Sequence, residues 1–111
     1  MKSIVLLVFV SIISVESFAK GVAEKFNVTA VRVDQSGKGY VVFDRDLIGQ
    51  PAECITTYTN SLAFNTSTPG GQAILSLALA AKASGSPIKA VGTGKCDAYG
   101  VMEDWSYGFI Y

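Results

Sequence analysis

The chain contains no histidine among its 111 residues, which removes the usual general base and the commonest metal ligand of enzymes. A Ser or Cys nucleophile would therefore lack its ordinary partner. Carboxylates alone could still hydrolyse a glycosidic bond, and Glu103 and Asp104 are the pair to consider. Adjacent residues on a strand point to opposite faces, however, so these two cannot flank one bond. The sequence therefore predicts a protein that is not an enzyme and holds no metal or cofactor.

Charged residues are also scarce, and nine Lys and Arg are balanced by nine Asp and Glu. A balanced chain gives no electrostatic reason to expect nucleic acid or an anionic membrane as the partner. Neutral partners, such as sugars or protein surfaces, remain open.

Residues 1–19 have the pattern of a secretory signal peptide. Lys2 supplies the positive charge, residues 4–15 are almost entirely apolar, and the Ser-Phe-Ala that ends the segment fits the small-x-small cleavage rule. The apolar run is shorter than the roughly 20 residues that a spanning helix needs, which disfavours an uncleaved anchor. We therefore expect a secreted or periplasmic protein whose mature chain, residues 20–111, is a single domain without a membrane span.

Only two cysteines occur, Cys54 and Cys96. In an exported chain a single even pair is most simply a disulfide. By the loop-entropy model, a bridge across this separation contributes about 4 kcal/mol to the free energy of unfolding. That contribution matters in a small domain, because its core alone gives limited stability. Without a CxxC pair or a histidine to lower a thiol pKa, a redox or metal role for the two cysteines is disfavoured.

One long helix is expected over residues 68–85. Thr68 can cap its N-terminus, Pro69 suits its first turn, and Gly85 provides a stop. Most of its circumference is apolar, which indicates burial on more than one side, and it is too short to span a bilayer. Either the domain closes around this helix, or a second copy covers its free face. In the second case the helix from Thr68 to Gly85 is the interface of a homo-oligomer.

Five strands are expected, three before the helix and two after it. They cover residues 26–34, 40–43, 54–64, 87–97 and 102–111. The first should be bent, because its apolar residues fall at even positions as far as Ala30 and at odd positions after it. Bent strands are typical of small barrels. The expected fold class is therefore β-rich α+β, a small five-stranded barrel with one helix between strands 3 and 4 and one disulfide.

Two of these strands carry the candidate ligand-binding residues. Tyr58 and Asn60 lie in an unusually polar strand, which suits either a solvent-facing edge or a polar groove for a sugar. In the last strand, one face would carry four aromatic side chains: Trp105, Tyr107, Phe109 and Tyr111. Such a stripe usually belongs to the core. Otherwise Trp105 and Tyr107 are good stacking platforms for a sugar ring or a partner surface.

Two glycines, Gly92 and Gly94, precede Cys96 in a stretch that superficially resembles a phosphate-binding loop. The match fails, because Lys89 stands where the first glycine of that motif belongs and Cys96 replaces the magnesium-binding Ser or Thr. Close approach of two backbones at a strand crossing is the simpler explanation for these glycines.

The order of elements resembles the oligonucleotide/oligosaccharide-binding (OB) barrel, in the form found in cell-binding B subunits of bacterial two-component toxins, notably the subtilase-cytotoxin and pertussis-like group. The resemblance rests on Cys54, residues 68–85 with their exit at Pro87, the Gly-Thr-Gly-Lys-Cys run ending at Cys96, and the acidic-then-aromatic end, residues 103–111. It covers nearly the whole mature chain, which is also similar to a set of small uncharacterised secreted bacterial proteins. The resemblance implies an OB-like barrel that recognises a glycan as part of a ring of subunits, five in that group. No glycan-contact residue of the group can be matched here, so none is carried over.

Two functions are compatible with these observations. The first is a secreted, non-catalytic domain that binds a glycan, as a toxin B subunit does. The alternative is a secreted or periplasmic protein-interaction module, an inhibitor or accessory factor, that presents the aromatic last strand to a protein.

Overall fold

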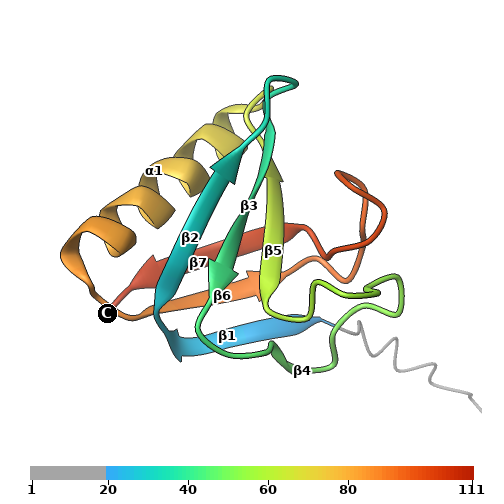
Figure 1. Cartoon of the computed structure of the whole chain (residues 1–111), viewed down its shortest axis with the longest axis horizontal. Helices are drawn as coiled ribbons and strands as arrows, with labels where there is room; N and C mark the ends of the chain where they lie inside the picture. The colour runs from blue at the N-terminus through green and yellow to red at the C-terminus, as the bar shows by residue number, and fades with distance from the viewer. Residues whose placement is uncertain (1–19) are drawn as a thin grey trace, which may run out of the picture.

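The computed structural model describes residues 20–111, so the expected signal peptide lies outside the described residues (Figure 1). The elements follow in the order β1 (Gly21–Phe26), β2 (Val28–Val33), β3 (Lys38–Phe43), β4 (Ile48–Gly49), β5 (Ser61–Asn65), α1 (Pro69–Ser84), β6 (Ile88–Gly92) and β7 (Trp105–Ile110). Within this part of the chain, no helix is long and apolar enough to cross a bilayer. The domain is β-rich with a single helix between β5 and β6, as the sequence predicts.

The strands form two antiparallel sheets, which cross steeply in Figure 1. Sheet A has the order β4-β1-β6-β7, and sheet B has the order β2-β3-β5. The sheets meet at two places. The chain passes from β1 to β2 through Asn27 alone, and Ala63 in β5 forms a parallel bridge with Asp104, just before β7. The expected count of five strands is therefore wrong, because the bent first strand is divided in two and the short β4 was not foreseen.

The bend has a local cause in the backbone. The register between β2 and β3 shifts between Val28 and Ala30, which confirms the bulge expected near Ala30. A second shift lies between Glu24 and Phe26, where Lys25 takes a φ of 55°. Two irregularities so close together turn the chain from sheet A into sheet B. The sequence prediction missed the first half of this strand, since it began at Phe26.

A strand was expected over residues 54–64, but the first part of this segment is not a strand. Residues 54–60 form loops and turns, and only Ser61–Asn65 pairs with β3. The β-branched residues of this segment have no neighbouring strand to pair with. Instead, the Thr56 N–H donates to the Val101 carbonyl, and the Thr59 hydroxyl donates to Asp46 at 2.7 Å. The prediction of a strand over residues 54–60 is therefore wrong, because high β propensity does not form a strand where no partner strand is available.

The helix begins and ends as the sequence predicts. The Thr68 hydroxyl accepts a hydrogen bond from the Gly71 N–H at 3.0 Å, and Gly85 takes the left-handed conformation with a φ of 68°. Ala78 and Ala81 are buried against the core, but Leu79 is 50% exposed. The domain thus covers one face of α1 and does not close around it.

Trp105 anchors the core, and the other aromatic residues of the last strand do not join it. Gly92 pairs with Trp105 and Val91 pairs with Tyr107, so Ser106 is an extra residue that forms a bulge in β7. The bulge reverses the alternation after Trp105. The expected single face of four aromatics is therefore wrong: Trp105 is 5% exposed, whereas Tyr107, Phe109 and Tyr111 lie on the solvent side.

The expected disulfide is present. Cys54 and Cys96 are bonded, with their Cα atoms 6.2 Å apart. The bond joins the loop before β5 to the loop between β6 and β7, two segments without regular structure. The disulfide therefore constrains two loops that no strand pairing constrains.

A buried carboxylate lies beside this disulfide-linked region. Glu103 is completely buried, and its two oxygens accept hydrogen bonds from the backbone N–H groups of Gly21, Ala52 and Gly94. A Cβ on Gly92 would lie only 1.6 Å from Glu103 Oε2. The close approach at Gly92 is thus to a side chain, and the expected contact between two backbones is wrong for this glycine. Glu103 ties the start of β1 to both disulfide-linked loops.

Candidate binding site

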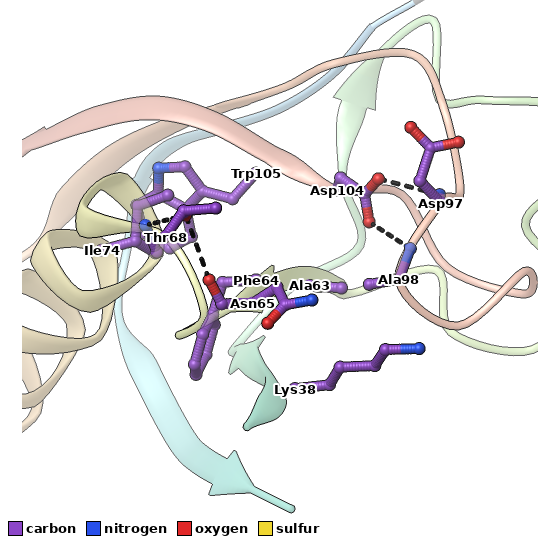
Figure 2. A pocket seen from close by; sticks show the side chains of 11 residues that line it. Lys38, Ala63, Phe64, Asn65, Thr68, Ile74, Asp97, Ala98, Asp104 and Trp105 are labelled. Carbon is purple, nitrogen blue, oxygen red and sulfur yellow. Dashed lines mark hydrogen bonds between the residues drawn. The ribbon is translucent and has the colours of Figure 1, made fainter. Parts of the chain in front are cut away.

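A pocket of about 360 Å³ opens between the end of β5, the N-terminus of α1 and the loop before β7 (Figure 2). Its volume is at the lower end of the range of about 300–1,000 Å³ that is usual for small-molecule sites. Apolar side chains provide much of the wall, namely Ala63, Phe64, Ile74, Ala98 and Trp105. The pocket is therefore large enough for one small ring and offers that ring an apolar surface.

Polar groups of opposite charge line the same pocket. Lys38 comes from the start of β3 and Asp97 from the loop before β7, and Figure 2 shows Asp97 at the upper right with Lys38 below it. Within residues 20–111, neither side chain has an ion pair. The side-chain amide oxygen of Asn65 (Oδ1) accepts a hydrogen bond from the Ser67 N–H at 3.0 Å. The site thus presents a cation, an anion and an amide, which together can donate to and accept from ligand hydroxyl groups.

Asp104 shapes one wall of the pocket. Its carboxylate accepts hydrogen bonds from the N–H groups of Asp97 at 2.8 Å and Ala98 at 3.1 Å, as Figure 2 shows. Burial raises the pKa of Asp104, and the nearby charges of Asp97 and Glu103 add to this effect. Glu103 accepts instead from the N–H groups of Gly21, Ala52 and Gly94, so the two neighbouring carboxylates have no hydrogen-bond partner in common.

Three tyrosines form a cluster beside the pocket. The ring centroids of Tyr58 and Tyr99 each lie 5.9 Å from that of Tyr40. Tyr40 pairs with Ala63, a residue of the pocket wall, and stands two residues from Lys38 on the same face of β3. The tyrosine cluster (Tyr40, Tyr58 and Tyr99) thus extends the pocket along the outer face of sheet B.

Arg32 and Asp34 fix the rim of the tyrosine cluster. The Arg32 guanidinium lies 5.5 Å from the Tyr40 ring centroid and pairs with Asp34 at 2.8 Å. The Tyr99 hydroxyl donates a hydrogen bond to Asp34 at 2.5 Å, and this bond, followed by the Arg32 contact, lowers the pKa of Asp34. Two of the three rings are therefore held by polar contacts as well as by each other.

Tyr99 should ionise at a higher pH than an ordinary tyrosine. Its burial, followed by the hydrogen bond to Asp34, raises its pKa from 10.0 to about 12. A group whose pKa is raised by folding contributes stability below its unfolded pKa and loses it as the pH rises through the folded pKa. Stability should therefore fall between about pH 10 and pH 12. Ultraviolet titration of tyrosinate checks this, with Tyr99→Phe to identify the step and Asp34→Asn to lower its pKa. Loss of a step near pH 10 in Tyr99→Phe would contradict the assignment.

The structure does not bring the four candidate residues of the sequence together. Tyr58 belongs to the tyrosine cluster, and Trp105 lines the pocket from within the core. Asn60 is half-buried and donates to the Phe43 carbonyl at 3.4 Å, so it supports the loop. Tyr107 is 55% exposed on the outer face of sheet A.

Sequence reasoning missed most of the residues that make the site. Lys38 and Tyr40 could have been found, because a hairpin around the glycine turn places Tyr40 directly opposite Arg32. Asp97 and Tyr99 lie in the loop that the disulfide joins to the segment before β5, and no periodic pattern marks them. Among residues 20–111, no three Cys, Asp or Glu side chains are placed to hold a metal ion. No family model matches the chain, and neither the curated proteins nor the solved structures contain a significant match to it.

Proposed function

We propose that this protein is a secreted or periplasmic, non-catalytic domain that binds a glycan at the pocket and the adjoining tyrosine cluster. The observation that carries the proposal is the combination of three clustered tyrosine rings with Lys38 and Asp97, which form no ion pair within residues 20–111. Sugars bind where an aromatic surface meets their C–H face and where polar groups meet their hydroxyls. The presence of both charges favours a ligand of low net charge.

We also infer that the two sheets form an OB-like barrel. The divided first strand, β1 and β2, takes part in both sheets, and the bridge between Ala63 and Asp104 links β5 to the start of β7. These two links are the connections that a small barrel of this kind needs. In that arrangement the pocket lies at the boundary between β5 and β7, next to the helix. Export is supported by the disulfide, since such bonds persist in oxidising compartments.

Replacing Tyr58 with alanine should weaken glycan binding about 2- to 10-fold, because one aromatic contact contributes about 0.5–1.5 kcal/mol. A glycan array with the mature domain selects the ligand, and titration calorimetry with the soluble oligosaccharide measures the affinity. Tyr58 is 36% exposed and lies in a loop, so the change should leave the fold intact.

Tyr107→Ala is the matched control, because Tyr107 is an exposed tyrosine away from the pocket and the cluster. Its affinity per site should equal that of the unchanged protein. Equal losses in both variants, or no binding to any glycan, would refute the proposed site.

The second candidate function is the protein-interaction module. One observation favours it: sheet A leaves apolar side chains exposed on its outer face, including Ile48 and Tyr107. Large exposed apolar patches on soluble domains commonly mark protein interfaces. Substitution of these side chains should then abolish association with a protein and leave the pocket unaffected.

A further inference from the structure

The outer face of sheet A carries an apolar row that runs across all four strands. In register, Ile48 lies beside Val22, Val22 beside Val91, and Val91 beside Tyr107. Cross-strand neighbours share a face, so these four side chains project to the same side. Ala23, in the alternate register, projects to the core and is fully buried. Val91 is only 7% exposed, so Ile48 and Tyr107 are the members of the row that solvent reaches most. The solvent face of an antiparallel sheet is ordinarily polar, so this row requires an explanation.

The exposed apolar residues of the domain are concentrated on this face. Eight large hydrophobic side chains are exposed within residues 20–111, and four of them project from the outer face of sheet A: Ile48 (51%), Tyr107 (55%), Phe109 (45%) and Tyr111 (47%). The other four are divided among β2, the loop before β5, α1 and the opposite face of β7. The outer face of sheet A is therefore the part of the surface where a binding partner would bury the most exposed apolar side chains.

Charged residues flank the row in a balanced arrangement. Glu24 and Lys89 are cross-strand neighbours two register positions beyond Val22 and Val91, so they project from the same face as the apolar row, and their charged groups are 3.3 Å apart. Lys89 is in turn the neighbour of Phe109 on β7. One acid and one base side by side do not favour a strongly charged partner.

The pattern is self-complementary about one particular axis. A twofold axis parallel to the strands, between β1 and β6, would place β1 of one copy over β6 of the other and β4 over β7. Three pairs would then face each other: Val22 with Val91, Ile48 with Tyr107, and Glu24 with Lys89. Every apolar residue of the row meets an apolar one, and each charge meets its opposite. An isologous dimer interface requires this match.

We propose that two copies of this chain dock through the outer faces of their A sheets about this twofold axis. Aligned sheets pack about 10 Å apart with their strands within about 30°, which keeps the three pairs opposite one another. None of the residues that line the pocket or form the tyrosine cluster belongs to this face. The dimer would therefore leave two sites open and could bind a multivalent surface with avidity.

The structure favours this face over the helix that the sequence suggested. The free side of α1 exposes Leu79 as its one large hydrophobic residue, and its neighbours there are small or polar: Gln72, Ala73, Ser76, Ala80 and Ala83. Sheet A offers more apolar side chains and a matched ion pair.

Charge reversal tests the axis directly. In Glu24→Lys both faces of a self-pair would be positive, and in Lys89→Glu both would be negative. Like charges placed opposite each other oppose association. By sedimentation equilibrium, the unchanged mature protein should be a dimer. The dimer dissociation constant of each variant alone should be at least about 10-fold higher than that of the unchanged protein. An equimolar mixture of the two variants should form a one-to-one heterodimer.

Tyr107→Ser and Leu79→Ser distinguish a dimer through sheet A from a dimer through α1. Both residues are about half exposed and neither is in the core, so both variants should fold. The proposal expects dissociation with Tyr107→Ser and none with Leu79→Ser. It is overturned by a monomeric unchanged protein, by a mixture of charge variants that does not associate, or by dissociation with Leu79→Ser alone. Since glycan titration is a separate measurement, failure of the binding site and failure of the dimer can be told apart.

Discussion

Replacing Glu103 with glutamine should lower the free energy of unfolding by about 3 kcal/mol, measured by urea denaturation. The carboxylate is fully buried and accepts from Ala52 at 2.7 Å, from Gly94 at 3.2 Å, and from Gly21 at 2.9 and 3.1 Å. Hydrogen bonds to a charged group contribute about 1.5–3 kcal/mol each, and a buried N–H left unpaired costs a further 1–3 kcal/mol, roughly. The NH₂ group of the glutamine amide would replace one of these acceptor oxygens, and it cannot accept from the backbone N–H groups of Gly21, Ala52 or Gly94.

Gly92→Ala tests the buried position of the Glu103 side chain, since the Cβ of the alanine would lie 1.6 Å from Glu103 Oε2. It should destabilise the protein by a similar amount. In a Glu103→Ala background the clash is absent, so the two losses should not be additive. Gly70→Ala is the control, because its Cβ would meet nothing within 4 Å and the helix should tolerate it. A Glu103→Gln protein as stable as the unchanged one would contradict this role.

Removing the disulfide should have the second large effect. The double substitution Cys54→Ser and Cys96→Ser opens a loop with a sequence separation of 42 and should lower the free energy of unfolding by about 2–4 kcal/mol. Cys54 lies four residues before Tyr58, and Cys96 lies three residues before Tyr99. The tyrosine cluster should therefore loosen before the sheets do. Loss of the near-ultraviolet dichroism of the tyrosines, with the far-ultraviolet signal retained, would report this order.

Reduction of the unchanged protein by a dithiol should reproduce the behaviour of the double variant. Glycan affinity should fall in parallel, because two of the three clustered rings come from the disulfide-linked loops. If the reduced protein kept both its stability and its near-ultraviolet signal, the disulfide would not be what positions the cluster.

The features that could be predicted from the sequence are those determined by local chemistry. The helix was marked by Thr68 and Gly85, whose capping roles depend only on nearby backbone groups. The bulge near Ala30 was visible as a break in the alternation of apolar residues. The pairing of Cys54 with Cys96 followed from there being only two cysteines.

The features that were missed depend on contacts between distant segments. The bulge at Ser106 places Trp105 in the core and Tyr107 in solvent, although their spacing suggested one face. Glu103 is buried because three backbone segments converge on it, which no local pattern reveals. The candidate site is assembled in the same way, since Asp97 and Tyr99 reach it through the disulfide-linked loop.

The central claim is that the pocket and the tyrosine cluster are where a ligand binds. Nuclear magnetic resonance titration of the mature domain with the best oligosaccharide from the array tests it most directly. The account predicts shift changes concentrated at Lys38, Tyr58, Asn65, Asp97 and Tyr99, with sheet A unaffected. Changes confined to the outer face of sheet A, or a spectrum that no oligosaccharide alters, would contradict it.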